Sequence, residues 1–354
     1  MIKVFGRLSG QALSRSSWRA RLSRLIRRPE MTAAVMLALV AGSLSVLNGT
    51  FRTFDNVVWV LHSFSVTGIA AMGILLLIIT GVVDLSCGAQ MGVAAAITAS
   101  VIRRYPGTPD PVILGAALTT GVTFGLFNSI MCTKLKLNPF IATLATSYVG
   151  RGMSGVFATT VILPAVAGLR WVFARLRWLD SQAVPTRGFP KSLTQLGQGS
   201  ALGLPLLVWI MVLLMIFWHW VLTRTRYGHW VFAVGANESA AKLSGVPVDS
   251  VRTATHISSG LMCALAGFLY TCRMGVPMSG TGYEMDIISG SIIGGVPMDG
   301  GAGTVAAAVL GVGLMAFIRN GLVLLHIGAL WQQLLTGILT ILSIVFDRMR
   351  RMND

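Results

Sequence analysis

Long apolar stretches fill most of the chain and alternate with short polar segments. Several exceed the roughly 18 to 20 residues that a helix needs to cross the hydrocarbon core of a bilayer. The pattern predicts an all-α fold, a polytopic transmembrane helical bundle of about ten spans. The predicted spans are residues 31–48, 57–83, 87–104, 111–133, 139–163, 204–223, 251–274, 285–297, 301–319 and 327–346.

The span at 285–297 is short and flanked by glycines, so we expect a broken or re-entrant helix there. A bilayer tolerates such backbone only where protein or water covers its free polar groups. Pairs of glycines four residues apart are typical of membrane helices that pack closely. They occur at Gly88/Gly92, Gly121/Gly125 and Gly290/Gly294.

The composition agrees with a membrane protein. The 354 residues are 54% hydrophobic and 11% charged, with a mean hydropathy of +0.73, whereas an ordinary soluble domain carries about 25% charged residues. The net charge is +16, and eight of the 28 basic residues lie within residues 1–28, where no acidic residue occurs. This placement follows the positive-inside rule of membrane proteins, so no nucleic-acid partner is expected.

The charge pattern also predicts the orientation in a bacterial inner membrane. Residues 1–30 are expected to form a basic, amphipathic N-terminus on the cytoplasmic leaflet, in contact with lipid. Residues 31–346 form the predicted transmembrane domain, and residues 347–354 a cytoplasmic tail. Ten crossings place both termini in the cytoplasm. Within the domain, 164–203 is rich in proline and glycine and is predicted to be an irregular periplasmic loop, while 224–250 is predicted to be a cytoplasmic loop.

The cytoplasmic loop has the chemistry of a short helix with defined ends. Asn237 is a good N-cap, and Glu238 suits the positive end of the helix dipole. Gly245 suits the position after the helix, and Pro247 prevents continuation. A short capped helix on the cytoplasmic side is what docking to a separate motor would require.

This stretch resembles the cytoplasmic coupling loop of ribose-type sugar ABC permeases, members of the branched-chain amino acid/ribose permease superfamily. The matching residues are Ala233, Gly235, Asn237, Ala240, Ala241 and Gly245. Similar family segments follow in order from about residue 30 to 346, among them GVVDLSCG at 81–88, NPFIATL at 138–144 and GTGYEMD at 280–286. The sequence departs from the family pattern at Ala236, His229 and Lys242.

The resemblance implies the inner-membrane component of a binding-protein-dependent transport system that imports a monosaccharide. Its implied partners are a second permease chain, cytoplasmic ABC ATPase subunits and a periplasmic sugar-binding protein. ATP and Mg²⁺ would be held by the ATPase subunits, with no cofactor in this chain. The residues implied in ATPase coupling are Asn237, Glu238, Ala240, Ala241, Lys242, Ser244 and Gly245.

Two structural breaks are expected within the membrane. The first is marked by Asp84, Ser86 and Gly88, and the second by Gly294 and Gly295. We interpret Asp84 as a cap for a helix that begins near Leu85, with Ser86 assisting, although a carboxylate at membrane depth also raises a functional hypothesis. Glu284, Asp286 and Asp299 carry the same two interpretations near the second break. Arg151 is expected to pair or to reach the interface.

The translocation pathway of a hydroxylated solute calls for neutral polar side chains within spans. The candidates are Asn128, Thr143, Thr146, Ser147, Ser154, Asn320 and Gln332. Each of them could instead join two helices by a hydrogen bond.

Several alternatives stay open at this stage. A permease of the same family for a nucleoside, an autoinducer or a branched-chain amino acid would show much the same pattern. An ion-driven secondary transporter would need charged groups inside the membrane, of which Asp84 is the clear example. A membrane enzyme would need a nucleophile or a metal constellation, and neither is visible. The sequence has no Gly-Lys pair and therefore no P-loop, so we expect a transporter subunit with no catalytic residues and no metal site.

Overall fold

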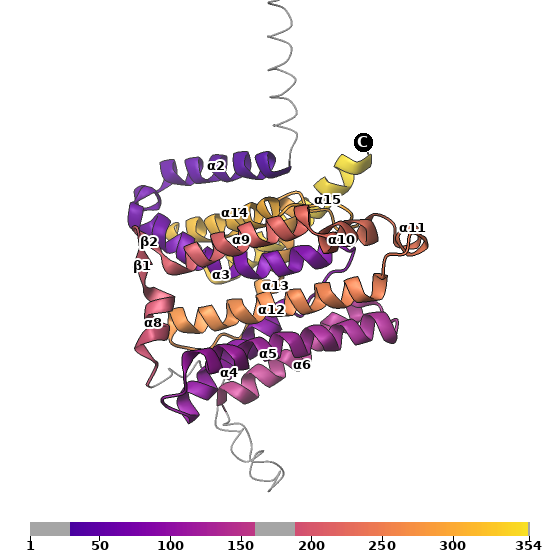
Figure 1. Ribbon diagram of the computed structural model, residues 1–354. Coiled ribbons are helices and arrows are strands. Elements are labelled where there is room, and N and C mark those ends of the chain that lie inside the picture. The colour runs from indigo at the N-terminus through magenta and orange to yellow at the C-terminus, as the bar shows by residue number, and fades with distance from the viewer. Residues whose placement is uncertain (1–28, 160–187, 353–354) are drawn as a thin grey trace, which may run out of the picture.

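The computed structural model describes residues 29–159 and 188–352 (Figure 1). The amphipathic helix predicted within residues 1–28, the part of the predicted periplasmic loop at 160–187 and the last two residues of the tail lie outside the described residues.

The described residues are predominantly helical, as the apolar pattern predicts. One short antiparallel pairing, of β1 (Ser200–Ala201) with β2 (Leu204–Pro205), interrupts the helices. The helices are α2 (Pro29–Leu47), η1 (Gly49–Arg52), α3 (Phe54–Ile79), α4 (Cys87–Arg104), α5 (Asp110–Ser129), η2 (Ile130–Lys134), α6 (Pro139–Thr159), α8 (Lys191–Gln198), α9 (Leu206–Arg224), α10 (Arg226–Ala236), α11 (Glu238–Leu243), α12 (Val248–Met274), α13 (Tyr283–Ile293), α14 (Val305–Leu324) and α15 (Ala329–Met352).

Each predicted span overlaps one of these helices. Among the described residues, five helices are long and apolar enough to cross a bilayer: α3, α5 with its continuation η2, α9, α12 and α14. The chain is therefore a polytopic helical membrane protein, while the total of ten spans stays a prediction. The short span is α13, which ends four residues earlier than predicted because Gly294 stops the helix.

The central helix of the bundle is α12. It packs against α3, α4 and α5, and Figure 1 shows it between the group α4, α5 and α6 on one side and α3, α13, α9 and α14 on the other. The second half of α3 is completely buried from Ile69 to Ile79 and forms the middle of the apolar core. α11 lies at one end of the bundle, whereas α8 and the β1–β2 pair lie at the opposite end.

Glycines bring the helices into close contact, as their spacing predicts. A side chain at Gly121 of α5 would collide with the carbonyl of Gly260 in α12. Gly88 of α4 meets the backbone of Gly280, and Gly290 of α13 meets Val312 of α14. These pairs therefore act in helix packing.

The prediction of an irregular loop over 164–203 is wrong at its C-terminal end. Residues 191–198 form α8, which begins after Pro190 and buries Leu193 and Gly197. The carbonyl of Gly197 lies 2.7 Å from Nε2 of His62, and Nε2 of Gln198 donates to the carbonyl of Arg273 at 2.8 Å. Tertiary contacts with α3 and α12 thus hold a helix of eight residues whose sequence looks like a turn region.

Candidate functional site

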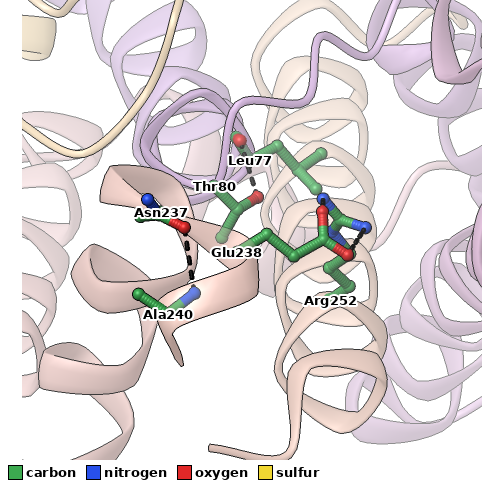
Figure 2. A network of polar contacts seen from close by, with 6 residues as sticks. All are labelled: Leu77, Thr80, Asn237, Glu238, Ala240 and Arg252. Carbon is green, nitrogen blue, oxygen red and sulfur yellow. Dashed lines mark hydrogen bonds and ion pairs between the residues drawn. The ribbon is translucent and has the colours of Figure 1, made fainter. Parts of the chain in front are cut away.

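The segment between α9 and α12 forms a compact unit at one end of the bundle. The side chain of Asn237 caps α11, since its Oδ1 accepts a hydrogen bond from the Ala240 amide at 2.9 Å (Figure 2). Glu238 accepts two hydrogen bonds from Arg252 in the first turns of α12, at 3.2 and 2.7 Å. The predicted cap is therefore present, and an ion pair that the sequence analysis missed ties α11 to α12.

The far end of α11 also follows the prediction. Ser244 is the C-cap, and Gly245 adopts a φ of +81°, a left-handed conformation that favours glycine. Ala241 packs inward, whereas Ala240, Lys242 and Ser244 are exposed. Leu243 is 91% exposed. The helix thus presents a basic and an apolar side chain to the outside, while the role of these residues in ATPase coupling stays a prediction.

The prediction of one short helix in this loop misses α10, which precedes α11. Thr225 caps α10, because its side chain accepts a hydrogen bond from the Gly228 amide at 3.1 Å. Burial against the core raises the pKa of the Tyr227 phenol to about 12, so this ring stays neutral. α10 packs against α9, α12 and α3.

A close backbone junction joins this unit to the end of α3 and to the loop before α14. A Cβ at Gly235, near the end of α10, would lie 1.7 Å from the carbonyl oxygen of Ile79 and 2.6 Å from the amide of Gly301. The same Gly301 amide donates to Ile79 at 2.8 Å. Figure 2 shows Thr80 and Leu77, at the end of α3, beside the capped helix. The ends of α3 and α10 and the loop before α14 therefore meet at one point.

The first break is a buried hydrogen-bond network. Oδ1 of Asp84 accepts from the amide and the hydroxyl of Ser86, at 2.7 and 2.5 Å, and Oδ2 accepts from Nε2 of Gln90 at 3.0 Å. Asn128 of α5 donates to the Ser86 hydroxyl at 2.9 Å, and the Thr143 hydroxyl of α6 accepts from the Leu85 amide at 3.2 Å. This network ties the break to two neighbouring helices.

The interpretation of Asp84 as a helix cap needs correction. The helix begins at Cys87, and its N-cap residue is Ser86, which makes no side-chain capping bond. Asp84 instead closes a turn before the helix and accepts from Gln90 one turn inside it. The aspartate can do this because the break lets the chain fold back on its own carboxylate.

The predicted pathway residues separate into three groups. Asn128 and Thr143 belong to the buried network. Thr146 and Ser154 donate to carbonyls of their own helix α6, and Ser147 is buried in the same helix. Asn320 and Gln332 line a cavity elsewhere.

That cavity measures about 200 Å³ and lies between α3, α12, α13, α14 and α15. Its lining combines four aromatic side chains with charged and hydrogen-bonding side chains. The members other than aliphatic residues are Trp59, Ser63, Phe64, Thr67, Tyr270, Arg273, Tyr283, Asp286, Met315, Arg319, Asn320 and Gln332. Sequence analysis found two of them as pathway candidates and left the role of Asp286 open.

Both acidic residues in the first turn of α13 are paired with arginines of other helices. Glu284 binds Arg151 of α6 at 2.5 Å, which confirms that Arg151 pairs. Asp286 binds Arg319 of α14 through two contacts, at 2.7 and 2.9 Å. The positive end of a helix dipole also favours carboxylates here. These pairs fasten the short helix α13 to α6 and α14.

The second predicted break has the expected glycines. Gly294 caps the end of α13, and a side chain there would collide with the carbonyl of Ala307 in α14. Gly295 has a φ of +96°. No cluster of three potential metal ligands occurs among residues 29–159 and 188–352 as far as they are described.

Comparison with known proteins agrees with this architecture. The family model described as "Branched-chain amino acid transport system / permease component" matches residues 56–344. The ribose import permease protein of Escherichia coli (strain K12) is 28% identical over 324 residues, 91% of this chain and 94% of the relative. The ribose import permease protein of Bacillus subtilis (strain 168) is 31% identical over 306 residues, 86% and 88% of the two chains.

A third relative is the L-arabinose transport system permease protein of Escherichia coli (strain K12). It is 30% identical over 327 residues, which cover 90% of both chains. No solved structure matches this chain significantly. With a family match over most of its length and relatives of this similarity, the chain belongs to the family of permease components of branched-chain amino acid transport systems.

Proposed function

We propose that the chain is the membrane-spanning subunit of an ATP-driven importer for a monosaccharide, and that this monosaccharide is a pentose. The observation that carries the proposal is the capped helix α11, presented at one end of a membrane bundle whose sequence has no P-loop. Relatives that cover about nine-tenths of the chain are named as ribose and L-arabinose permeases. These names support a sugar as the solute.

In this proposal, α11 docks on a cytoplasmic ABC ATPase through its exposed face. Lys242 and Leu243 offer a charge and an apolar side chain to the partner. A groove of about 260 Å³ beside them is lined by Glu238, Lys242 and residues 246–250. The N- and C-termini would then lie in the cytoplasm, and a second permease chain and a periplasmic sugar-binding protein would complete the complex.

The contacts of α11 define how a movement there would reach the membrane. The Glu238–Arg252 pair passes a displacement to α12, the central helix. The junction at Gly235 passes it to the end of α3 and to the loop before α14. Rigid elements joined in this way can move as bodies between two states, which is how a motor on one face could open and close a pathway.

The experiment that tests this proposal is transport in a defined system. The complex is copurified from its native host and reconstituted in proteoliposomes with its binding protein. We expect uptake of radiolabelled D-ribose or L-arabinose when ATP is supplied on the side of the membrane that carries the ATPase. We expect no uptake when an ion gradient is the only energy source. Accumulation on a sodium or proton gradient without ATP, or uptake of leucine with no uptake of either pentose, would reject the proposal.

A further inference from the structure

The polar cavity lies at the end of the bundle opposite to α11. α12 begins at Val248, beside the groove at α11, and its last turn carries Arg273, which lines the cavity. A helix of 27 residues is about 40 Å long, which is enough to cross a bilayer. If α11 faces the ATPase, the cavity therefore opens toward the face at which an imported solute arrives.

The cavity holds hydrogen-bonding groups in fixed positions. Nη1 of Arg273 donates to the Ser63 hydroxyl at 3.1 Å, and its guanidinium lies over the ring of Trp59 at 5.9 Å from the centroid. Asn320 and Asn56 exchange two hydrogen bonds at 3.0 and 3.1 Å. These side chains keep their orientation before any solute binds.

The Asp286–Arg319 pair is the strongest polar feature of the cavity. The Asp286 side chain is 11% exposed, whereas that of Arg319 is 48% exposed. The carboxylate is thus covered by protein, and the guanidinium keeps free N–H donors beside it. A pair in this position can accept and donate hydrogen bonds at once.

We propose that this cavity is the binding site of the solute on the face opposite α11, and that its ligand is an uncharged polyol. The inference rests on the proposed function. A hydroxyl group both donates and accepts, so it satisfies Asp286 and Arg319 together without an unpaired charge. A cation such as putrescine would meet Arg319 and Arg273. L-Leucine carries both charges and is the competing ligand, so the labelling experiment compares it with ribose directly. The rings of Trp59, Tyr270 and Tyr283 offer apolar faces to the C–H side of a sugar.

Labelling of an introduced cysteine tests the site directly. Thr67 lines the cavity and donates to a carbonyl of its own helix, so a Thr67→Cys side chain replaces it with little change. Thr108, in the loop after α4, also donates to a nearby backbone carbonyl and gives the matched control Thr108→Cys. Both variants are labelled in reconstituted membranes with a membrane-impermeant maleimide. The protein without an introduced cysteine is labelled in parallel, and the signal from its four native cysteines is subtracted.

We expect D-ribose to slow labelling of Thr67→Cys roughly tenfold at about ten times its Kd, and to leave Thr108→Cys unchanged. L-Leucine and putrescine give no protection. In the background of Arg319→Gln, ribose no longer protects Thr67→Cys. Trp59→Leu is the second variant, because it removes the aromatic face without touching the ion pair and therefore tests the site even if Arg319→Gln fails to fold.

The outcomes separate this inference from the proposed function. If wild-type protein takes up ribose but ribose never protects Thr67→Cys, or protects it equally in both variant backgrounds, the cavity is not the binding site. If protection by leucine or putrescine equals that by ribose, the ligand class is wrong. If the wild-type complex takes up no pentose at all, the proposed function itself fails.

Discussion

The two ends of the bundle each carry an ion pair between an acidic residue and an arginine of another helix, in different surroundings. At the α11 end, Glu238 and Arg252 form a two-point ion pair in which the side chains are 50% and 24% exposed. At the cavity end, Asp286 and Arg319 form a similar pair whose carboxylate is 11% exposed. Each pair has one half-exposed partner, since the Arg319 side chain is 48% exposed. The difference is that the carboxylate of the second pair is covered, so water screens it less.

The two pairs therefore have different roles: one orients a helix, and the other contributes to the stability of the fold. An exposed ion pair contributes about 1 kcal/mol or less, so the Glu238–Arg252 pair serves mainly to fix α11 on α12. Removing one partner of a fully buried pair costs about 3 kcal/mol or more, because it leaves a charge without compensation. For the Asp286–Arg319 pair we expect about 2 kcal/mol, because the carboxylate is covered but Arg319 is half exposed. The cavity pair is therefore part of what holds α13 in place, and the pair at α11 can be changed without unfolding the bundle.

The largest expected effect is at the backbone junction of Gly235 with the end of α3. Gly235→Ala places a Cβ within 1.7 Å of a backbone oxygen, so the end of α3 must move away from α10. We expect a loss of about 3 kcal/mol or more in stability and loss of ATP-driven uptake. Thermal unfolding in detergent measures the first effect. The control is Gly152→Ala, where the added methyl group meets nothing within 4 Å, and equal stability of the two variants would contradict the junction.

The next largest effect is the difference in stability between variants of the two ion pairs. Arg319→Gln leaves the covered Asp286 carboxylate without its partner and should lower stability by about 2 kcal/mol, whereas Arg252→Gln should lower it by about 1 kcal/mol or less. Unfolding of both variants by the same thermal assay measures the difference. A larger loss in Arg252→Gln than in Arg319→Gln would overturn the comparison, because burial would then not decide the strength of these pairs.

A smaller effect is expected at the first break. Asp84→Asn keeps one acceptor for Ser86 but turns an amide donor toward Gln90, so we expect a loss of about 1 to 2 kcal/mol. Asp84→Ala should cost more, since it leaves the buried donors of Ser86 and Gln90 without this partner. Complete loss of uptake in Asp84→Asn at unchanged thermal stability would instead favour a role in the pathway.

The smallest effect is at the cap of α11. Asn237→Ala removes the acceptor for the Ala240 amide and should cost the helix about 1 kcal/mol. Because α11 is exposed, global stability changes little, and hydrogen exchange of the α11 amides is the suitable measurement. Protection equal to that in the wild type would show that the Glu238–Arg252 pair alone holds the helix.

Features that depend on local chemistry could be predicted from the sequence. Asn237 and Gly245 act within a few residues of their own helix, so their roles in capping were visible without a structure. The spacing of Gly121 and Gly125 likewise predicted close packing of helices. The apolar pattern gave the spans, because each span must satisfy its own backbone hydrogen bonds in a bilayer.

Features that depend on tertiary contacts could not be predicted. Asp286 and Arg319 lie 33 positions apart on different helices, and no local pattern pairs them. α8 is too short to be recognised without its contacts to α3 and α12. The role of Ser86 as the N-cap residue in place of Asp84 depended on how the broken chain turns within the bundle.

The central claim is that force from an ATPase enters the membrane domain through α11 and its ion pair with α12. Exchanging the charges tests this claim most directly, with ATP-driven ribose uptake in proteoliposomes as the measurement and thermal unfolding as the check on folding. We predict that Glu238→Arg abolishes uptake in a folded, assembled complex, and that adding Arg252→Glu restores most of it. Wild-type uptake in Glu238→Arg, or no recovery in the folded double variant, would contradict the account.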